Sequence, residues 1–313
     1  MAALNAFRLQ YQKNKVYREW CGQLNVSDES VMEITDIPFL PIEFFKSHAI
    51  VTKSVTAKPV CFTSSSTTSQ VPSKHYVSDV LVYEKSFKAG FRIFYGAPKD
   101  YCILALLPNY LEREGSSLVY MCRQLIDESE HPRSGFFLRE MDALLSTIDF
   151  LKQKSQKTLL IGVSYALLNL CEFGVKLSDN FIVMETGGMK GTRKEMLKSE
   201  LHTALISGLG VKTIHSEYGM TELLSQAYSH GNGIFKCPPW MRVMTREIDD
   251  PLNLINDGRT GGINVIDLAN INSCCFIATK DIGRTYSDGS FELLGRYDHS
   301  DVRGCNLMLE NLE

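Results

Sequence analysis

From Pro59 to Gly219 the chain alternates short apolar runs with longer segments of helical periodicity. Runs such as YCILALLP, TLLIGVS and FIVMET are typical of strands that are buried on both faces. Segments such as MDALLSTIDFLKQ and KEMLKSELHTALISGLG instead repeat their apolar residues at helical spacing. Strands that alternate with helices predict an α/β fold with a largely parallel sheet. Ligands of such sheets bind beyond the carboxyl ends of the strands.

The segments on either side of this region have different sequence patterns. The first thirty or so residues have helical spacing, and ITDIPFLPIEFFKSH then predicts an extended segment because prolines interrupt helices. After Tyr228 the chain carries glycines, prolines and short alternating runs, which predicts hairpin-connected strands. We therefore expect an α/β region over residues 1–228 and a smaller β-rich subdomain over residues 229–295.

Composition excludes several classes of protein. The net charge of −3 gives no general attraction to nucleic acid, which binds clustered Lys and Arg. No window approaches the ~20 apolar residues of a membrane-spanning helix, and the N-terminus lacks a secretory signal. We expect no membrane span and a cytoplasmic protein.

Nine cysteines without a CxxC pair argue against a disulfide framework or a zinc site. Cys274 and Cys275 are expected inside a core strand.

One stretch, FTSSSTTSQVPSK, places seven hydroxyl side chains in a row before Gln70. Clustered hydroxyls and backbone N–H groups are the means by which a loop holds phosphate oxygens without a large net charge. The stretch follows an apolar run and contains no acidic residue. A flexible linker is the alternative interpretation, because runs of Ser and Thr are common in linkers.

Two further segments follow strand-like runs. METGGMKGTRKEM places a glycine pair after FIVME, which lets backbone approach a flat ligand and equally suits an ordinary turn. SEYGMTE follows VKTIH and carries Glu222. A carboxylate beside a phosphate loop suits a magnesium ligand, whereas a Glu at a helix start is commonly a cap. Loops at one edge of a sheet can meet in a single pocket.

The ordered set FTSSSTTSQVPSK, SEYGMTE, KDIGR and LLGRYDHSDVRG resembles the successive motifs of the adenylate-forming superfamily, which includes acyl-CoA synthetases and luciferase. Within it, METGGMKG, ALLPNYLEREGSSLVYM and IPFLPIEFFK are most similar to the acyl-protein synthetase family, with phenylacetate-CoA ligases as nearer relatives. The match runs from about Ile37 to Leu309. It implies the large N-terminal domain of that superfamily, with the C-terminal lid domain absent or vestigial.

The resemblance also implies the roles of individual residues. The ATP phosphate loop would be lined by Ser64, Ser65, Thr67, Thr68 and Ser69. The nucleotide would also contact Gly187, Gly188, Glu217, Tyr218 and Gly219, with the two paired glycines and the tyrosine at the adenine. Thr221 would meet the α-phosphate, Glu222 would hold Mg²⁺, and Asp281 would bind the ribose. Arg296 would reach the ribose or phosphate, and Asp298 falls at the hinge.

Two departures from the superfamily pattern stand out. Ser66 and Ser69 occupy positions where the loop normally has glycines, so left-handed backbone there would cost about 1 kcal/mol each. The sequence also stops at Glu313, soon after the hinge motif, with no lysine downstream of Arg296. Acyl-protein synthetases are similarly short, which favours that family over the CoA ligases.

The last region, residues 296–313, is expected to be a hinge remnant that carries Cys305. The resemblance implies that Cys305 accepts the acyl group from an acyl-adenylate, since a thiolate is a good nucleophile. A packed terminal strand is the alternative for this cysteine. The implied substrates are a fatty or aryl carboxylic acid and Mg·ATP, and the implied partner is a protein similar to an acyl-CoA reductase.

Two other functions stay open at this point. The chain is a non-catalytic subunit of the same fold if the serine loop binds an adenylate without turning ATP over. It is a CoA ligase if free CoA takes the acyl group in place of Cys305. The histidines His75, His215 and His299 are assigned no catalytic role.

Overall fold

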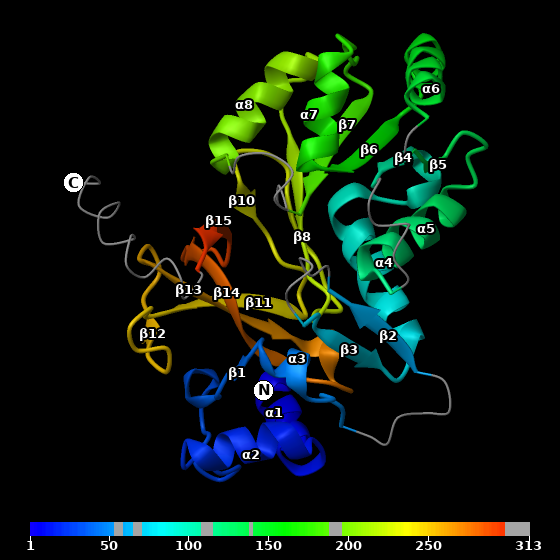
Figure 1. The fold of residues 1–313 in the computed structure, drawn as a ribbon. Helices are drawn as coiled ribbons and strands as arrows, with labels where there is room; N and C mark the ends of the chain where they lie inside the picture. Colours follow the sequence, from blue (N-terminus) through cyan, green and yellow to red (C-terminus); the bar gives the residue numbers. More distant parts are fainter. Residues whose placement is uncertain (53–58, 65–70, 108–114, 138–139, 188–195, 298–313) are drawn as a thin grey trace.

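The computed structural model describes residues 1–52, 59–64, 71–107, 115–137, 140–187 and 196–297. Two large sheets dominate this part of the chain, and a two-stranded hairpin lies beside them (Figure 1). Three short 3₁₀ helices connect the larger elements: η1 (Ile34–Asp36), η2 (Pro98–Asp100) and η3 (Leu268–Asn270).

The first sheet has six strands in the order β5-β4-β6-β7-β8-β9. Their bounds are β4 Cys102–Leu106, β5 Gly135–Phe136, β6 Thr158–Val163, β7 Phe181–Thr186, β8 His215–Tyr218 and β9 Ala227–Ser229. All neighbours are parallel except β8 and β9. Every residue of β4 and β6 is buried, as expected of strands covered on both faces. The predicted, largely parallel sheet is confirmed.

Helices cover both faces of this sheet (Figure 1). They are α4 (Val80–Tyr95), α5 (Ser117–Ser129), α6 (Met141–Gln153), α7 (Ser164–Glu172) and α8 (Lys198–Leu209). Side chains define where two of them begin: Asp79 accepts a hydrogen bond from the backbone of Leu81, and Ser116 accepts one from Val119. In Figure 1, α7 and α8 lie on one side of the sheet and α4 and α5 on the other. Strands β7 and β8 end beside each other at one edge of this sheet.

The second sheet is mostly antiparallel, in the order β10-β15-β14-β13-β11-β12. Its strands are β10 Ile234–Phe235, β11 Met241–Arg246, β12 Leu254–Ile255, β13 Thr260–Asp267, β14 Phe276–Thr285 and β15 Phe291–Arg296. Short connections join consecutive antiparallel neighbours, as predicted for the region after Tyr228. Cys274 and Cys275 were expected within a strand, but they lie directly before β14. Both are fully buried.

The first fifty residues pack against this second sheet (Figure 1). They form α1 (Ala2–Lys13), α2 (Lys15–Gln23), β1 (Leu40–Pro41) and α3 (Phe44–Ser47). Strand β1 pairs in parallel with β14, and Gln10 accepts a 2.9 Å hydrogen bond from the backbone of Cys275. This segment was predicted as part of the α/β region of residues 1–228. The division of the chain at residues 228 and 295 stays a prediction.

A hairpin of β2 (Val60–Thr63) and β3 (Lys74–Val77) encloses the hydroxyl-rich stretch. Its register pairs Val60 with Val77 and Thr63 with Lys74. The ring of Phe62 packs edge-on against the rings of Tyr83 and Tyr120, which anchors the hairpin to the helices of the first sheet. The stretch is therefore attached to the protein body at both ends.

Candidate active site

A cluster of side chains at the end of β8 joins the two sheets. It consists of Tyr218, Asp281 and Arg296. The Tyr218 hydroxyl donates a 2.7 Å hydrogen bond to Asp281 Oδ2, and Arg296 Nε lies 3.3 Å from Asp281 Oδ1. The Tyr218 ring packs edge-on against Phe235 and Phe291 of the second sheet. Burial raises the pKa of Tyr218 well above its usual range. Three residues predicted to contact the nucleotide therefore form one cluster.

Side chains outside the segment hold the turn that carries Thr221 and Glu222. His75 Nδ1 lies 2.8 Å from the Thr221 carbonyl, and Asn270 donates a 2.7 Å hydrogen bond to the Glu222 carbonyl. Asp267 accepts hydrogen bonds from the backbone of Leu224 at 2.8 Å and from the hydroxyl of Ser225 at 2.6 Å. The turn presents its two predicted functional side chains from a fixed backbone.

His75 has a positioning role that the sequence did not reveal. A carbonyl only accepts, so Nδ1 carries the proton in its contact with Thr221. Burial lowers the pKa of His75 to about 4, which keeps the imidazole neutral at neutral pH. Asn270 and Asp267, which support the same turn, also escaped prediction. No local motif marks them, because they lie 42 to 48 residues away in sequence from the residues they hold.

The carboxyl group of Glu222 lies beside the ends of the hydroxyl-rich stretch. Burial raises its pKa, while a hydrogen bond from Ser73 and the charge of Arg296 act in the opposite direction. Ser73 in turn donates its backbone N–H to Ser64 Oγ at 2.8 Å, and the Ser64 N–H returns a bond to the Ser73 carbonyl at 3.1 Å. The base of the predicted phosphate loop is thus joined to Glu222. Ser73 lies inside the quoted stretch but was assigned no role.

Gly187 lies at the end of β7, the strand next to β8. Its φ of +69° falls in the left-handed region, which explains a glycine there. The Ser164 hydroxyl donates a 2.9 Å hydrogen bond to the Gly187 carbonyl and fixes the start of the turn. The glycine lies at the same sheet edge as Tyr218, as predicted from the strand order.

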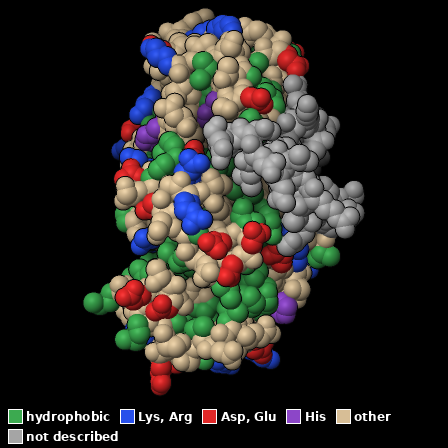
Figure 2. Space-filling view, turned by 90° about the vertical axis from the view of Figure 1, so that its left-hand side faces the viewer, with side chains coloured by type: hydrophobic (Ala, Val, Ile, Leu, Met, Phe, Trp, Pro, Cys, Tyr) green, Lys and Arg blue, Asp and Glu red, His purple; other side chains and the backbone are tan. Residues whose placement is uncertain are grey.

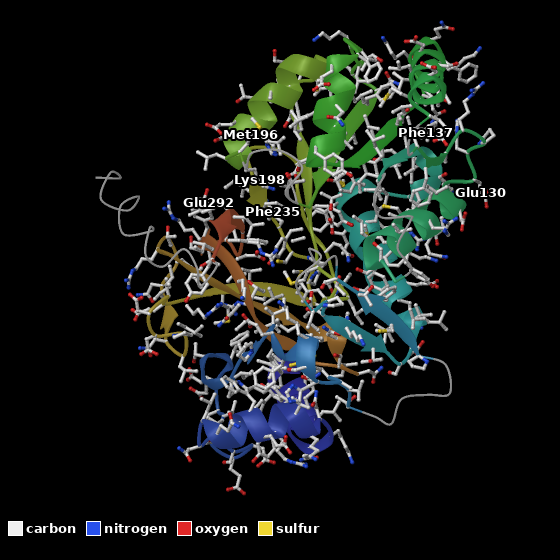
Figure 3. All side chains as sticks on the ribbon, in the orientation of Figure 1. Glu130, Phe137, Met196, Lys198, Phe235 and Glu292 are labelled. Carbon is white, nitrogen blue, oxygen red and sulfur yellow. The ribbon has the colours of Figure 1, made fainter. Side chains whose placement is uncertain are left out.

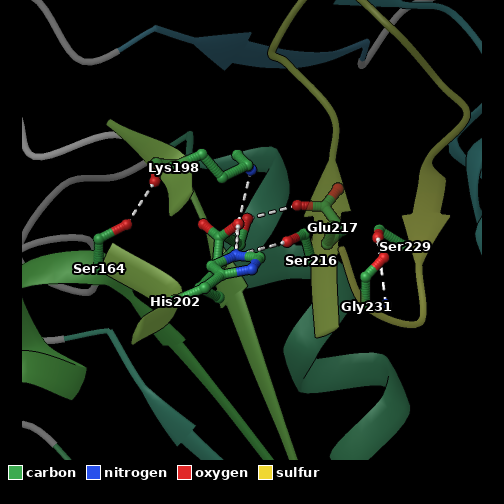
Figure 4. Close-up of polar contacts among 10 residues, drawn as sticks. Ser164, Lys198, His202, Ser216, Glu217, Ser229 and Gly231 are labelled. Carbon is green, nitrogen blue, oxygen red and sulfur yellow. Dashed lines mark hydrogen bonds and ion pairs between the residues drawn. The ribbon is translucent and has the colours of Figure 1, made fainter. Parts of the chain in front are cut away.

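A buried ionic network lies on the α8 side of this edge (Figure 4). Lys198 Nζ is 2.6 Å from Glu185 Oε1, and His202 Nε2 lies 3.5 Å from the same oxygen and 3.3 Å from Ser216 Oγ. Burial opposes ionisation of Glu185, but Lys198, His202 and Ser216 together lower its pKa to about 2. Figure 3 places Lys198 beside Phe235, and its ammonium lies 4.9 Å from that ring centroid. No pattern in the sequence predicted this network.

Glu217 belongs to the same edge and has different surroundings. Thr186, its partner across the β7–β8 pair, donates a hydrogen bond to its carboxyl group. Burial raises the pKa of Glu217 to about 7; the hydrogen bond from Thr186 opposes this rise, and the charge of Glu185 adds to it. Gly219 follows two residues later, where a Cβ atom would overlap Glu217 Oε1.

The carboxyl group of Glu222 fits a single-carboxylate magnesium site. The described residues contain no cluster of three or more His, Cys, Asp or Glu that would hold a metal ion by protein ligands alone. Mg²⁺ at phosphate-binding sites commonly takes one or two carboxylates and completes its shell with phosphate oxygens and water. Glu222, beside the base of the hydroxyl-rich stretch, supplies the required type of oxygen donor.

The structure therefore brings together many of the predicted residues. Those that lie at or next to the joined strand ends are Ser64, Gly187, Glu217, Tyr218, Gly219, Thr221, Glu222, Asp281 and Arg296. Those outside the described residues are Ser65, Ser66, Thr67, Thr68, Ser69, Gly188, Asp298 and Cys305. The roles that the resemblance gave to both groups stay predictions.

The surface and the helices add two general observations. On the described part of the face in Figure 2, acidic and basic side chains lie among one another. Among the helices of the described residues, none is both long enough and apolar enough to cross a membrane.

Solved structures of adenylate-forming enzymes share this fold. A 2-hydroxyisobutyryl-CoA ligase in complex with 2-HIB-AMP and CoA matches with a TM-score of 0.68 at 11% identity, over 95% of this chain and 69% of that chain. ATP-bound MatB from Rhodopseudomonas palustris matches with a TM-score of 0.56 at 14% identity, over 75% of this chain and 47% of that one. The chain spans about half the length of the solved structures of this MatB group. The predicted fold class is confirmed.

A relative of known name matches nearly the whole chain. It is the long-chain-fatty-acid–luciferin-component ligase of Aliivibrio fischeri, 22% identical over 334 residues, which cover 98% of this chain and 86% of the relative. The family model described as "Acyl-protein synthetase, LuxE" matches residues 1–312. Both findings agree with the family that the ordered motifs predicted. The chain is a member of the acyl-protein synthetase family.

Proposed function

We propose that this acyl-protein synthetase activates a fatty acid with Mg·ATP and then carries the acyl group as a thioester on Cys305. The observation that supports this most is the cluster at the end of β8. This cluster consists of Tyr218, Asp281 and Arg296. The charges of Asp281 and Arg296 also act on the pKa of the Glu222 carboxyl group. Ligands of parallel sheets bind at this edge.

In the first step, a carboxylate oxygen of the acid attacks the α-phosphorus of ATP, an acyl-adenylate forms and pyrophosphate leaves. Tyr218 and Gly187 would border the adenine, and Asp281 would accept hydrogen bonds from the ribose hydroxyls. Arg296, whose side chain is 75% exposed, is free to reach a phosphate or ribose oxygen. Glu222 would hold Mg²⁺, which neutralises charge on the phosphate oxygens when it is bound. The fixed turn keeps Thr221 and Glu222 in position throughout.

The proposed class of acid substrate is taken from the Aliivibrio fischeri relative. The printed name of the Aliivibrio fischeri protein gives it a long-chain fatty acid, and we propose the same class of acid for this chain. An aryl acid is the alternative to be tested alongside it.

In the second step, the sulfur of Cys305 attacks the acyl carbon, a thioester forms and AMP leaves. Cys305 lies outside the described residues, and three of the described cysteines are poor alternatives. Burial raises the pKa of Cys102 to about 11 and the pKa of Cys21 and Cys237 to about 12. A thiol with such a pKa is almost entirely protonated at neutral pH and therefore a weak nucleophile. A reductase that receives the acyl group is the proposed partner.

Exchange of labelled pyrophosphate into ATP, measured with fatty acids of increasing length and with benzoate, tests the first step. We expect exchange with the fatty acids. If folded protein that binds nucleotide exchanges with no acid, the proposal is wrong.

Labelled acid tests the second step. We expect ATP-dependent label on wild-type protein and on Cys171→Ala, a matched change on α7, but none on Cys305→Ala. If Cys305→Ala retains adenylation and transfers the acyl group to free CoA as well as wild type does, the acceptor is CoA and not the cysteine.

A further inference from the structure

Neighbouring residues at the ends of β7 and β8 face opposite sides of the first sheet. Glu185 and Ser216 are paired across the two strands and contact α8 through His202. Thr186 and Glu217 are the next pair, so the pleat turns them toward the other face. Glu217 accordingly interacts electrostatically with Tyr83 of α4 and Cys122 of α5. The edge thus carries two buried carboxyl groups in separate environments.

Glu217 has no cationic partner within ion-pair distance among the described residues. Lys198, the cation whose charge reaches it, is engaged at 2.6 Å with Glu185. The titratable groups that act on or are acted on by Glu217 come from five elements: Glu185 of β7, Lys198 of α8, Tyr83 and Tyr95 of α4, Cys122 of α5 and Tyr228 of β9. Because no cation compensates its burial, the neutral form of this carboxyl group is favoured.

The groups around Glu217 leave hydrogen-bonding capacity unused. The carboxyl group extends toward Gly219, where an added Cβ atom would force Glu217 Oε1 to shift. Gln226 lies against the same glycine, and its buried Oε1 has no hydrogen-bond partner among the described residues. The same holds for the hydroxyl of Tyr228, the cross-strand neighbour of Glu217. Buried polar groups are normally satisfied, so such groups beside a turn of the site indicate a polar ligand.

We propose that Glu217, in its neutral form, receives the carboxylate of the acid substrate and shares its proton with it. This inference rests on the proposed function and gives Glu217 an acid-binding role, whereas the resemblance placed it at the nucleotide. Two carboxyl groups that share one proton avoid the repulsion between two carboxylates. The proton stays on Glu217 when the substrate oxygen attacks phosphorus, so the acid reacts as its carboxylate.

The sharing of one proton makes acid binding depend on pH. The pKa of Glu217, raised by burial to about 7, sets the pH range in which the affinity for the acid changes. Below this pH Glu217 is neutral and binds the carboxylate. Above it Glu217 ionises, and the apparent affinity for the acid falls about tenfold per pH unit because only the neutral fraction binds. The KM for ATP does not share this dependence.

Pyrophosphate exchange with decanoate as the probe, followed between about pH 6 and pH 9, tests the inference kinetically. We expect the KM for decanoate to rise by about 100-fold across this range in wild type. Glu217→Gln cannot titrate but still donates a hydrogen bond, and its KM should stay nearly constant. Asp179→Asn, the same chemical change at an exposed ion pair, should behave as wild type. A flat wild-type profile, or the wild-type profile in Glu217→Gln, overturns the inference.

Calorimetric titration with decanoate in two buffers of different ionisation enthalpy needs neither turnover nor a folded variant. We expect uptake of nearly one proton at about pH 8 and of nearly none at about pH 6. No binding, or no uptake at the higher pH, overturns the inference. Exchange without uptake leaves the proposed function standing and removes this role of Glu217. Uptake without exchange for any acid keeps the role and removes the proposed activation.

Discussion

Glu185 and Glu217 are both buried, yet their carboxyl groups ionise in very different ranges of pH. Glu185 is 2% exposed and has a pKa of about 2, because Lys198, His202 and Ser216 outweigh the effect of burial. Glu217 is 7% exposed and has a pKa of about 7, because burial is opposed mainly by the hydroxyl of Thr186. The pleat of two adjacent strands separates them. Partners, rather than depth, decide what a buried carboxyl group does.

The largest expected effect on stability comes from removing Lys198, the cation that pairs with Glu185. Lys198→Met keeps most of the apolar stem against Phe235 but leaves Glu185 buried without its ammonium partner. We expect the free energy of unfolding at neutral pH to fall by about 3 to 5 kcal/mol, measured by urea denaturation. Lys212→Met, the control, breaks an ion pair whose side chains are both 82% exposed and should cost under about 1 kcal/mol. Equal losses in the two variants would contradict the comparison.

The next effect concerns pH and Glu217. A folded pKa of about 7 lies above the value in the unfolded chain, so the folded state holds the extra proton. Stability from this group is present at low pH and declines as pH rises from about 4 to about 7. Glu217→Gln removes that decline and should be more stable than wild type by roughly 2 to 3 kcal/mol at about pH 8. Denaturation at about pH 4 and pH 8 measures the difference; a gain that is the same at both values would contradict it.

A smaller loss of stability is expected when Asp281 loses its hydrogen bond from the phenol of Tyr218. Tyr218→Phe removes the 2.7 Å hydrogen bond but keeps the ring against Phe235 and Phe291. A hydrogen bond to a charged group contributes about 1.5 to 3 kcal/mol, so we expect a loss at the lower end of that range. Thermal unfolding would measure it, with Tyr11→Phe, at a half-buried tyrosine of α1, as the control. No difference between the variants would show that Asp281 does not rely on Tyr218.

The smallest effect on stability is expected at Arg296. Its side chain is 75% exposed, and pairs of this kind contribute about 0 to 1 kcal/mol. Arg296→Met should therefore unfold within about 0.5 kcal/mol of wild type while raising the KM for ATP, if the proposed nucleotide contact is correct. Urea denaturation and pyrophosphate exchange separate the two results. A large loss of stability would assign Arg296 to the fold instead of the site.

The sequence predicted the strands and loops of the site better than their supports. SEYGMTE and KDIGR named Tyr218, Glu222 and Asp281, which meet although Asp281 lies on β14 of the second sheet. Lys198, His202, Asp267 and Asn270 were missed. Each acts through a residue on another element, and a local pattern carries no trace of such a contact. The first fifty residues illustrate the same limit, because their helical spacing does not say which sheet they cover.

The sequence by itself determined the order of strands and helices, the position of the motif loops and the family. These depend on periodicity and on the spacing of residues along the chain, which the sequence records directly. The tertiary structure alone decided that β1 pairs with β14, that Ser73 lies against Glu222, and that Glu185 is paired while Glu217 is not. Burial and ionic partners depend on distances between elements, and these are fixed only when the sheets and helices pack together.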